Sequence, residues 1–322
     1  MAQGDDETVP YTRGLHRIAP DVWSWLQPDG SWGWSNAGLI AGADASCLVD
    51  TLFDLPLTRE MLAAMADVTP GRPITDAVNT HGNGDHCFGN ELLAPEVRIH
   101  AAPEVAARMH GEAPEVITAL LGTRFGPPLD AFAHRCFGSF AFDGITLREP
   151  DVPVLADTTL EVGGREVRLL PLGPAHTGGD VAVHVPDAGV LFAGDLLFIG
   201  GTPVMWAGPA ASWIAACDAM IALGPEVIVP GHGPVTTVEG VLEMRAYLEH
   251  VDRQAREAFD AGKTWERAAF EMDLGRFAGL PDAERVVVTT HAAYRHLDPD
   301  LPDAGPVRLF ELMARWAAER SG

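Results

Sequence analysis

Apolar and polar positions divide the chain into a strand-rich part and a helical C-terminal part. Short apolar runs bounded by glycine, proline or aspartate are typical of strands. Such runs predict strands over residues 22–26, 37–41, 46–50, 74–79, 97–100, 158–162, 165–170, 181–185, 190–195 and 227–229. Apolar residues with helical spacing predict helices over 57–67 and 210–223, and one or two helices over 103–121. Interleaved strands and helices indicate an α/β fold.

Beyond residue 236 the pattern becomes helical, over 237–261, 264–271, 282–296 and 306–320. The last helix has an apolar face made of Val307, Leu309, Phe310, Leu312, Met313 and Trp316. This face indicates burial, either on the rest of the chain or in a homodimer contact. We therefore predict a strand-rich domain before residue 236 and a helical C-terminal extension over 236–322. Between 122 and 150 the pattern weakens, which predicts a mobile flap or an insertion.

Composition narrows the range of partners. The 322 residues carry a net charge of −23, and Lys263 is the single lysine. Such a charge disfavours nucleic acid and anionic membranes, so we expect a small-molecule substrate. The acidic residues 1–7 do not resemble a signal peptide, and no run reaches about 18 apolar residues. The four cysteines show no CxxC pairing, and we expect a cytoplasmic protein with reduced thiols.

The richest cluster of chemical groups follows the predicted strand 74–79. His81, Asn83, Asp85 and His86 fall within six residues, separated by glycines that allow a tight turn. Imidazole and carboxylate are the ligands expected for zinc, although a capped loop would also explain the cluster. His176, Asp195 and His232 each follow the end of a strand, next to glycine. Strand ends gather at one edge of a covered sheet, so these groups are expected to converge on one site.

Together these motifs resemble the metallo-β-lactamase superfamily, whose usual pattern is H-x-H-x-D-H followed by a histidine, an aspartate and a histidine. The matching residues are His81, Asn83, Asp85, His86, His176, Asp195 and His232, with Asp50 similar to a structural aspartate of the family. The resemblance covers about residues 15–235. It implies a four-layer αβ/βα sandwich with the metals at one edge, between two sheets.

The resemblance also implies how the ligands are shared. One metal would take His81, Asn83 and His176, and the other would take Asp85, His86 and His232, with Asp195 bridging them. Asn83 stands where the family usually has histidine, and an amide is a poorer zinc donor than imidazole. The resemblance therefore implies one firmly bound Zn²⁺, while the first site either holds a second, weaker Zn²⁺ or stays empty. Asp85 would be the catalytic residue that orients the metal-bound hydroxide, which forms because zinc lowers the pKa of its water to about 7.

These features predict a zinc-dependent hydrolase acting on an ester, lactone, thioester or amide of a small apolar or aromatic molecule. The aromatic residues Trp32, Trp34, Phe88 and Trp206 are predicted to contact the substrate. A substrate carboxylate would need Arg124, Arg135 or backbone amides. Three alternatives remain open: a hydrolytic dehalogenase of an activated aromatic, an iron-dependent oxygenase-type relative, and a non-catalytic binding protein.

Overall fold

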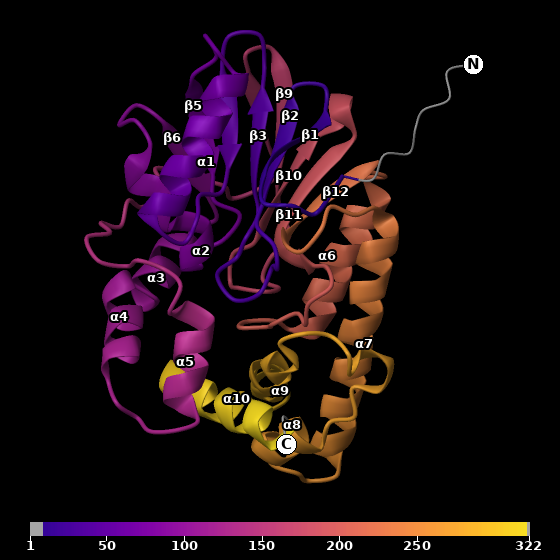
Figure 1. The fold of residues 1–322 in the computed structure, drawn as a ribbon. Helices are drawn as coiled ribbons and strands as arrows, with labels where there is room; N and C mark the ends of the chain where they lie inside the picture. The colour runs from indigo at the N-terminus through magenta and orange to yellow at the C-terminus, as the bar shows by residue number, and fades with distance from the viewer. Residues whose placement is uncertain (1–8, 321–322) are drawn as a thin grey trace.

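Two β-sheets form the centre of the molecule, in a computed structural model that describes residues 9–320 (Figure 1). The first sheet has seven strands in chain order: β1 (Gly14–Ala19), β2 (Val22–Leu26), β3 (Ala37–Ala41), β4 (Ser46–Val49), β5 (Ile74–Val78), β6 (Arg98–Ala101) and β7 (Val152–Pro153). The second has five, in the order β12 (Val227–His232), β11 (Val190–Phe198), β10 (Val181–Val185), β9 (Arg165–Pro171) and β8 (Thr158–Val162). The acidic residues 1–7 lie outside the described part.

The two sheets pack face to face and are covered on the outside by helices. Gly38 of β3 lies so close to the Phe192 ring of β11 that a side-chain Cβ there would come within 2.3 Å of it. Helix α1 (Leu55–Val68) packs on the first sheet, and α6 (Ala210–Ala222) and α7 (Val238–Asp260) pack on the second. Strands β2, β3, β10 and β11 are buried along their whole length, as strands covered on both faces must be. The predicted four-layer αβ/βα class is confirmed.

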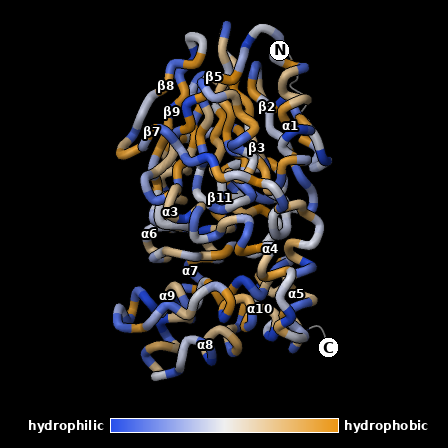
Figure 2. The backbone as a smooth tube through the Cα atoms, turned by 90° about the vertical axis from the view of Figure 1, so that its left-hand side faces the viewer, coloured by the Kyte–Doolittle hydropathy of each residue, from blue (hydrophilic) through white to orange (hydrophobic). Residues whose placement is uncertain are grey.

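The remaining helices gather at one end of the sandwich, where Figure 2 shows shorter apolar stretches than in the sheets. They are α2 (Gly84–Cys87), α3 (Glu104–Gly111), α4 (Pro114–Gly122), α5 (Leu129–Phe137), α8 (Trp265–Glu271), α9 (Val286–Leu297) and α10 (Pro306–Arg320). Short 3-10 turns occur at η1 (Phe88–Leu92), η2 (Pro186–Ala188), η3 (Gly275–Phe277) and η4 (Ala283–Arg285). Helix α5 contacts both α4 and α10, so the middle and the end of the chain meet here.

The structure corrects the expectation of a flap over residues 122–150. This segment contains α5, and Phe140 and Phe142 are buried against Phe53. Glycine and proline interrupt the apolar spacing, which is why the sequence pattern is weak although the aromatic rings belong to the core. Strand β1 was also not predicted.

The last helix packs within the chain. Leu309, Phe310, Leu312, Met313 and Trp316 are buried, whereas Val307 is half exposed. The boundary at residue 235 and the homodimer stay predictions. In the described part of the chain, no helix combines the length and the apolar character needed to cross a membrane.

Candidate metal centre and substrate cavity

Loops and strand ends from both sheets bring the predicted ligands to one edge of the sandwich. His81 and Asn83 lie in the loop after β5, and Asp85 and His86 lie on the short helix α2. His176 precedes β10, whereas Asp195 lies within β11 and His232 ends β12. Gly231 is needed for this approach, because a Cβ at that position would come within 1.9 Å of the Asp195 carboxylate. The fold therefore assembles the centre from segments far apart in the sequence.

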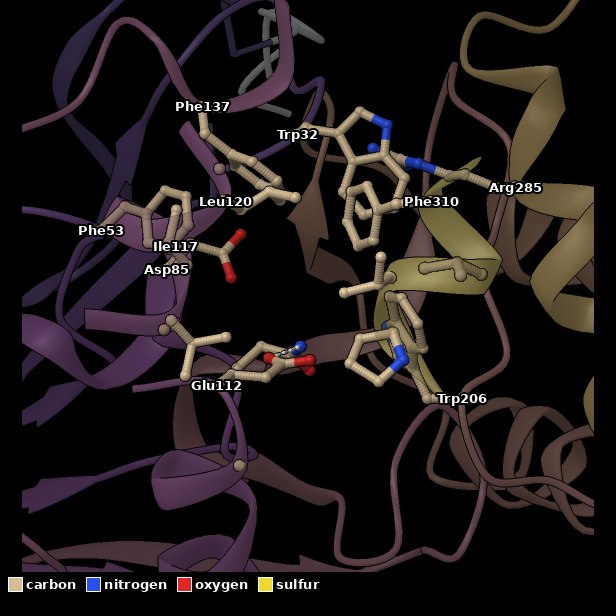
Figure 3. Close-up of a pocket in the computed structure, with 18 of the residues that line it drawn as sticks. Trp32, Phe53, Asp85, Glu112, Ile117, Leu120, Phe137, Trp206, Arg285 and Phe310 are labelled. Carbon is tan, nitrogen blue, oxygen red and sulfur yellow. Dashed lines mark hydrogen bonds between the residues drawn. The ribbon is translucent and has the colours of Figure 1, made fainter. Parts of the chain in front are cut away.

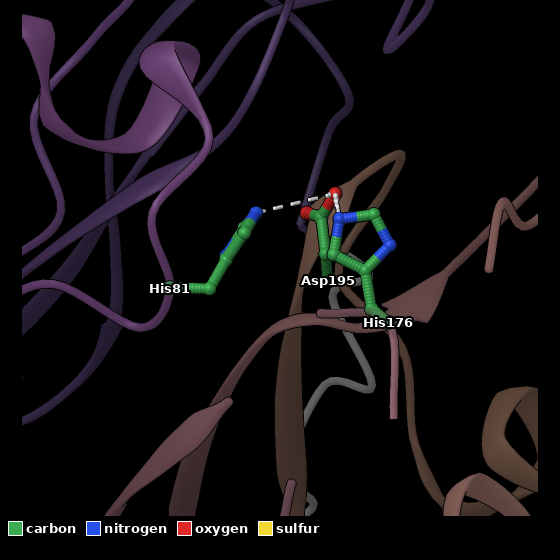
Figure 4. A group of neighbouring side chains, drawn as sticks. All are labelled: His81, His176 and Asp195. Carbon is green, nitrogen blue, oxygen red and sulfur yellow. Dashed lines mark ion pairs between the residues drawn. The ribbon is translucent and has the colours of Figure 1, made fainter. Parts of the chain in front are cut away.

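The ligand atoms form two groups that meet at Asp195. His81, His176 and Asp195 form one group, and Asp85, His86 and His232 form the other, with the ligand atoms of each group within 4.8 Å of one another. Asp195 Oδ1 lies 3.1 Å from His86 Nε2. Asp195 Oδ2 lies 3.3 Å from His176 Nε2 and 3.8 Å from His81 Nε2, as Figure 4 shows. It also lies 3.5 Å from His232 Nε2, so Asp195 faces all four imidazoles.

Each imidazole is oriented through its Nδ1, which leaves Nε2 directed at the centre. The Nδ1 partners are Thr80 Oγ1 for His81 at 3.1 Å, Asp50 Oδ2 for His86 at 2.9 Å, Val204 O for His176 at 2.7 Å and Gly30 O for His232 at 3.1 Å. Asp50 is itself fixed, because it accepts hydrogen bonds from the Thr80 backbone N–H and hydroxyl, both at 2.7 Å. Metal-ligating histidines are typically held in this way.

The charges and the unpaired atoms fit a divalent cation. Within residues 9–320, His81 Nε2, His86 Nε2 and Asp195 Oδ1 are buried and have no hydrogen-bond partner. Burial lowers the pKa of His176 to about 4, which keeps this ring neutral and able to donate a lone pair. Burial has the same effect on His232, but Asp195 and Asp85 outweigh it and raise its pKa to about 9. Imidazoles and carboxylates are zinc donors, and a cation would compensate the two buried carboxylates.

Asn83 lies beside this centre with both ends of its amide engaged. Its Oδ1 is 3.1 Å from His176 Nε2, and its Nδ2 donates a hydrogen bond of 2.7 Å to Glu112 Oε2. Glu112 follows α3 and pairs with Arg108 on that helix. Burial raises the pKa of Glu112 above its usual value, while Arg108 opposes that rise.

A cavity of about 450 Å³ opens directly onto the centre. Asp85, His176, Asp195 and His232 reach its floor, and its wall is largely apolar. Figure 3 shows the labelled wall residues around the space between Asp85 and Glu112: Trp32, Phe53, Ile117, Leu120, Phe137, Trp206 and Phe310. The site is thus a polar floor below an apolar chamber.

The structure places two of the four predicted substrate residues at this wall. Trp32 and Trp206 line the cavity. Trp34 and Phe88 are not among the lining residues: the Trp34 ring packs 4.8 Å from that of Phe140, and Phe88 stacks on Phe53 at 5.6 Å. Trp34 and Phe88 thus pack in an aromatic cluster beside the cavity, and the predicted contacts of all four residues with substrate stay predictions.

Several cavity residues were not identified from the sequence. Ile117, Leu120, Phe137 and Phe310 had no signal beyond helical spacing, and Glu112 had none. The arginine at the cavity is Arg285, not Arg124 or Arg135. Arg285 is 2% exposed, pairs with Asp282 at 3.0 Å and lies 4.5 Å from the Trp32 ring centre. The sequence predicted only a helix for this segment. Arg285 reaches the cavity through tertiary packing, which the sequence pattern does not show.

Comparisons with known proteins agree with this geometry. The family described as metallo-beta-lactamase superfamily matches residues 30–232. Acyl-coenzyme A thioesterase MBLAC2 of Gallus gallus is 27% identical over 212 residues, which are 62% of this chain and 72% of that protein. Hydroxyacylglutathione hydrolase of Cupriavidus metallidurans is 30% identical over 233 residues, which are 70% of this chain and 68% of that protein.

A solved structure extends the likeness of fold. The sec-alkylsulfatase Pisa1 from Pseudomonas sp. superimposes with a TM-score of 0.67 at 18% identity, covering 90% of this chain and 51% of that one. This chain therefore spans about half the length of the sulfatase, and the overlap exceeds the residues that the family matches. The family match and the relatives confirm the resemblance inferred from the motifs: the chain belongs to the metallo-beta-lactamase superfamily, as a hydrolase of that fold.

Proposed function

We propose that the protein is a zinc-dependent hydrolase that cleaves an ester, thioester, lactone or amide of a small apolar molecule. The observation that carries this proposal is the cluster of four oriented imidazoles and two carboxylates below an apolar cavity, with both carboxylates and two of the imidazoles reaching the cavity floor. Zinc suits these donors better than magnesium or calcium, which prefer oxygen ligands. Two relatives support the reaction class, since one is named a thioesterase and the other a hydroxyacylglutathione hydrolase.

The residues at the floor of the cavity would have separate roles in hydrolysis. Bound zinc would supply a hydroxide nucleophile near neutral pH and polarise the scissile carbonyl. Asp85 lines the cavity, and its Oδ2 lies 3.3 Å from His232 Nε2 and 3.8 Å from His86 Nε2. A carboxylate in this position can orient the attacking water and accept its proton. Asp50 and Val204 would keep the imidazoles of His86 and His176 aimed while charge develops.

The wall of the cavity supports an apolar substrate. Phe137 and Phe310 give the cavity aromatic surface, and Ile117 and Leu120 of helix α4 add aliphatic surface. Burying each methylene of an acyl chain against such a wall contributes about 0.8 kcal/mol. The wall would also keep bulk water from the reacting groups, which strengthens the electrostatic interactions inside the site.

We also propose a cytoplasmic location, because all four cysteines are buried free thiols, as is usual in reducing compartments.

The proposal is tested by metal analysis combined with a substrate panel. Purified protein should contain zinc, and it should hydrolyse at least one member of a panel of aliphatic esters, thioesters and lactones. Chelation should abolish this activity and added zinc should restore it. Iron as the metal in freshly purified protein, or hydrolysis that survives chelation, would contradict the proposal.

A further inference from the structure

We propose that Glu112 is a positioning residue that makes Asn83 an oxygen ligand of the first metal, so that the centre holds two metals although a histidine is replaced. This inference rests on the proposed metal centre and is independent of the substrate. The residues that carry it are Asn83, Glu112, His176 and Arg108, which connect the metal loop to helix α3.

The hydrogen bond to Glu112 fixes which end of the Asn83 amide faces the centre. A carboxylate can only accept a hydrogen bond, so the group 2.7 Å from Glu112 Oε2 must be the amide NH₂. The amide oxygen then points the other way, toward His176, whose Nε2 lies 3.1 Å from it. Without Glu112 the amide could turn over and present NH₂ to the centre, where it could not bind a cation.

The partner of this oxygen also presents a lone pair. His176 Nδ1 lies 2.7 Å from the carbonyl oxygen of Val204, which can only accept, so Nδ1 carries a proton and Nε2 is the ring nitrogen that can bind a metal. Its Nε2 is then an acceptor, like Asn83 Oδ1. Two acceptors directed at one place repel each other unless a cation lies between them. With His81 and Asp195, they complete a set of four donors, the usual number for zinc.

Helix α3 is held against the metal loop so that Glu112 can reach Asn83. Gly82 lies between the two ligands His81 and Asn83, and a Cβ there would come within 2.7 Å of Arg108 Cβ and 2.8 Å of Val105 O. Only glycine allows the helix to come this close. Arg108 pairs with Glu112, and its guanidinium lies 5.0 Å from the Trp206 ring centre, which fixes the carboxylate from the other side.

The hydrogen bond also offsets the weakness of the amide as a donor. When the amide N–H donates a hydrogen bond to a carboxylate, the electron density on the amide oxygen increases. Hydrogen-bond partners behind other metal ligands act in the same way. Loss of such a partner typically lowers metal affinity by about 10–100-fold.

A zinc titration of metal-free protein, followed by calorimetry or by competition with a chromophoric chelator, tests the inference. Wild-type protein should bind two zinc ions per chain. Glu112→Ala should weaken one of the two sites by about 10–100-fold and leave the other unchanged. Glu115→Ala is the matched control: Glu115 is an exposed carboxylate on the same cavity, and no described hydrogen bond or ion pair joins it to Asn83. This control should bind both ions as tightly as wild type.

A donor–acceptor exchange separates positioning from a general structural effect. Asn83→Asp alone supplies a charged oxygen ligand but places it against the Glu112 carboxylate, so the repulsion between the two carboxylates opposes the gain. Adding Glu112→Gln supplies an amide donor to the new carboxylate and should raise the zinc affinity of this site above that of Asn83→Asp alone. The visible absorption of the Co²⁺-loaded proteins should follow the same order, because it reports the ligands directly and does not depend on turnover.

Three results would overturn the inference. They are one zinc per chain in wild-type protein, both sites unchanged in Glu112→Ala, and equal losses in Glu112→Ala and Glu115→Ala. A single zinc with chelator-reversible hydrolysis would remove the role of Glu112 and leave the proposed function standing. Absence of zinc binding altogether would contradict both.

Discussion

The floor and the wall of the cavity differ in composition, in origin and in how firmly they are held. The floor consists of buried polar groups whose second polar atoms are hydrogen-bonded, as for His86 to Asp50. The wall is apolar, and parts of it face solvent: Val116 is 48% exposed, Phe125 45% and Val307 49%. From this difference we expect the reaction to depend on the hydrogen-bonded floor and substrate choice to depend on the wall.

The two regions also come from different parts of the chain. The floor uses strand ends and loops between residues 81 and 232, all inside the family match. The wall takes Arg285, Val307 and Phe310 from beyond that match, together with α4 and α5. The floor thus lies inside the part of the chain that the family matches, whereas the wall extends beyond it.

The largest expected effect comes from breaking the floor. Asp195→Ala removes the carboxylate that faces all four imidazoles, so both metals should be lost. Because metal activation of water supplies several kcal/mol, kcat/KM should fall by about a thousandfold or more. Metal content and ester hydrolysis measure the two effects.

Asp187→Ala is the control for this change, because Asp187 forms only an exposed ion pair with Arg165. Such pairs contribute about 0–1 kcal/mol, so metal content and rate should stay close to wild type. An Asp195→Ala protein that keeps its metals would refute the assignment of the floor.

A second prediction concerns the residue that joins wall to floor. Arg285 lies between the rings of Trp32 and Phe198, and the Phe198 ring stacks in parallel on His232 at 5.3 Å. Arg285→Met leaves Asp282 without its buried partner, so the free energy of unfolding should fall by about 3–5 kcal/mol. Chemical denaturation measures this loss.

Arg308→Met gives the comparison for Arg285, because Arg308 pairs with Glu311 on the surface of α10. Its loss should cost at most about 1 kcal/mol. Equal effects of the two substitutions would show that wall and floor are not joined through Arg285.

The smallest effect is expected at the mouth of the wall. Val307→Ala removes apolar surface worth about 1 kcal/mol, so kcat/KM for a long-chain ester should fall by about threefold to fivefold. Hydrolysis of the acetyl ester should be unchanged, because its acyl group does not reach the mouth. Leu242→Ala, which alters an equally exposed apolar residue on α7 outside the cavity, should affect neither ester. Equal losses for both esters in Val307→Ala would exclude a role in chain-length selection.

The floor could be predicted from the sequence and the wall largely could not. His81, Asp85 and His86 lie in one short run, and His176 and His232 lie at strand ends, so local pattern and fold class were enough for them. Asp195 was also identified, although β11 continues past the predicted end at residue 195 to Phe198. Phe137 and Phe310 have no local signal, because the packing of α5 on α10 decides which rings face the cavity. Tertiary packing also places Trp34 against Phe140 and Phe88 against Phe53, so these two rings are not among those that line the cavity.

Asn83 lies between these two cases. The sequence identified it as a departure from the usual histidine and predicted a first metal site that is weaker or empty. Its partner Glu112 is 29 residues away and follows a helix whose contact with the loop depends on Gly82. No spacing rule relates two such positions, so the compensation could be inferred only from the structure.

The most direct test of the account is the dependence of kcat/KM on acyl-chain length with and without zinc. A series of p-nitrophenyl esters from acetyl to decanoyl would be assayed with zinc-loaded and with chelator-treated protein. With zinc, kcat/KM should rise by up to about fourfold per added methylene until the cavity is filled. Chelator-treated protein should hydrolyse none of the esters. Hydrolysis without metal, or a rate independent of chain length, would contradict a metal floor beneath an apolar, selective wall.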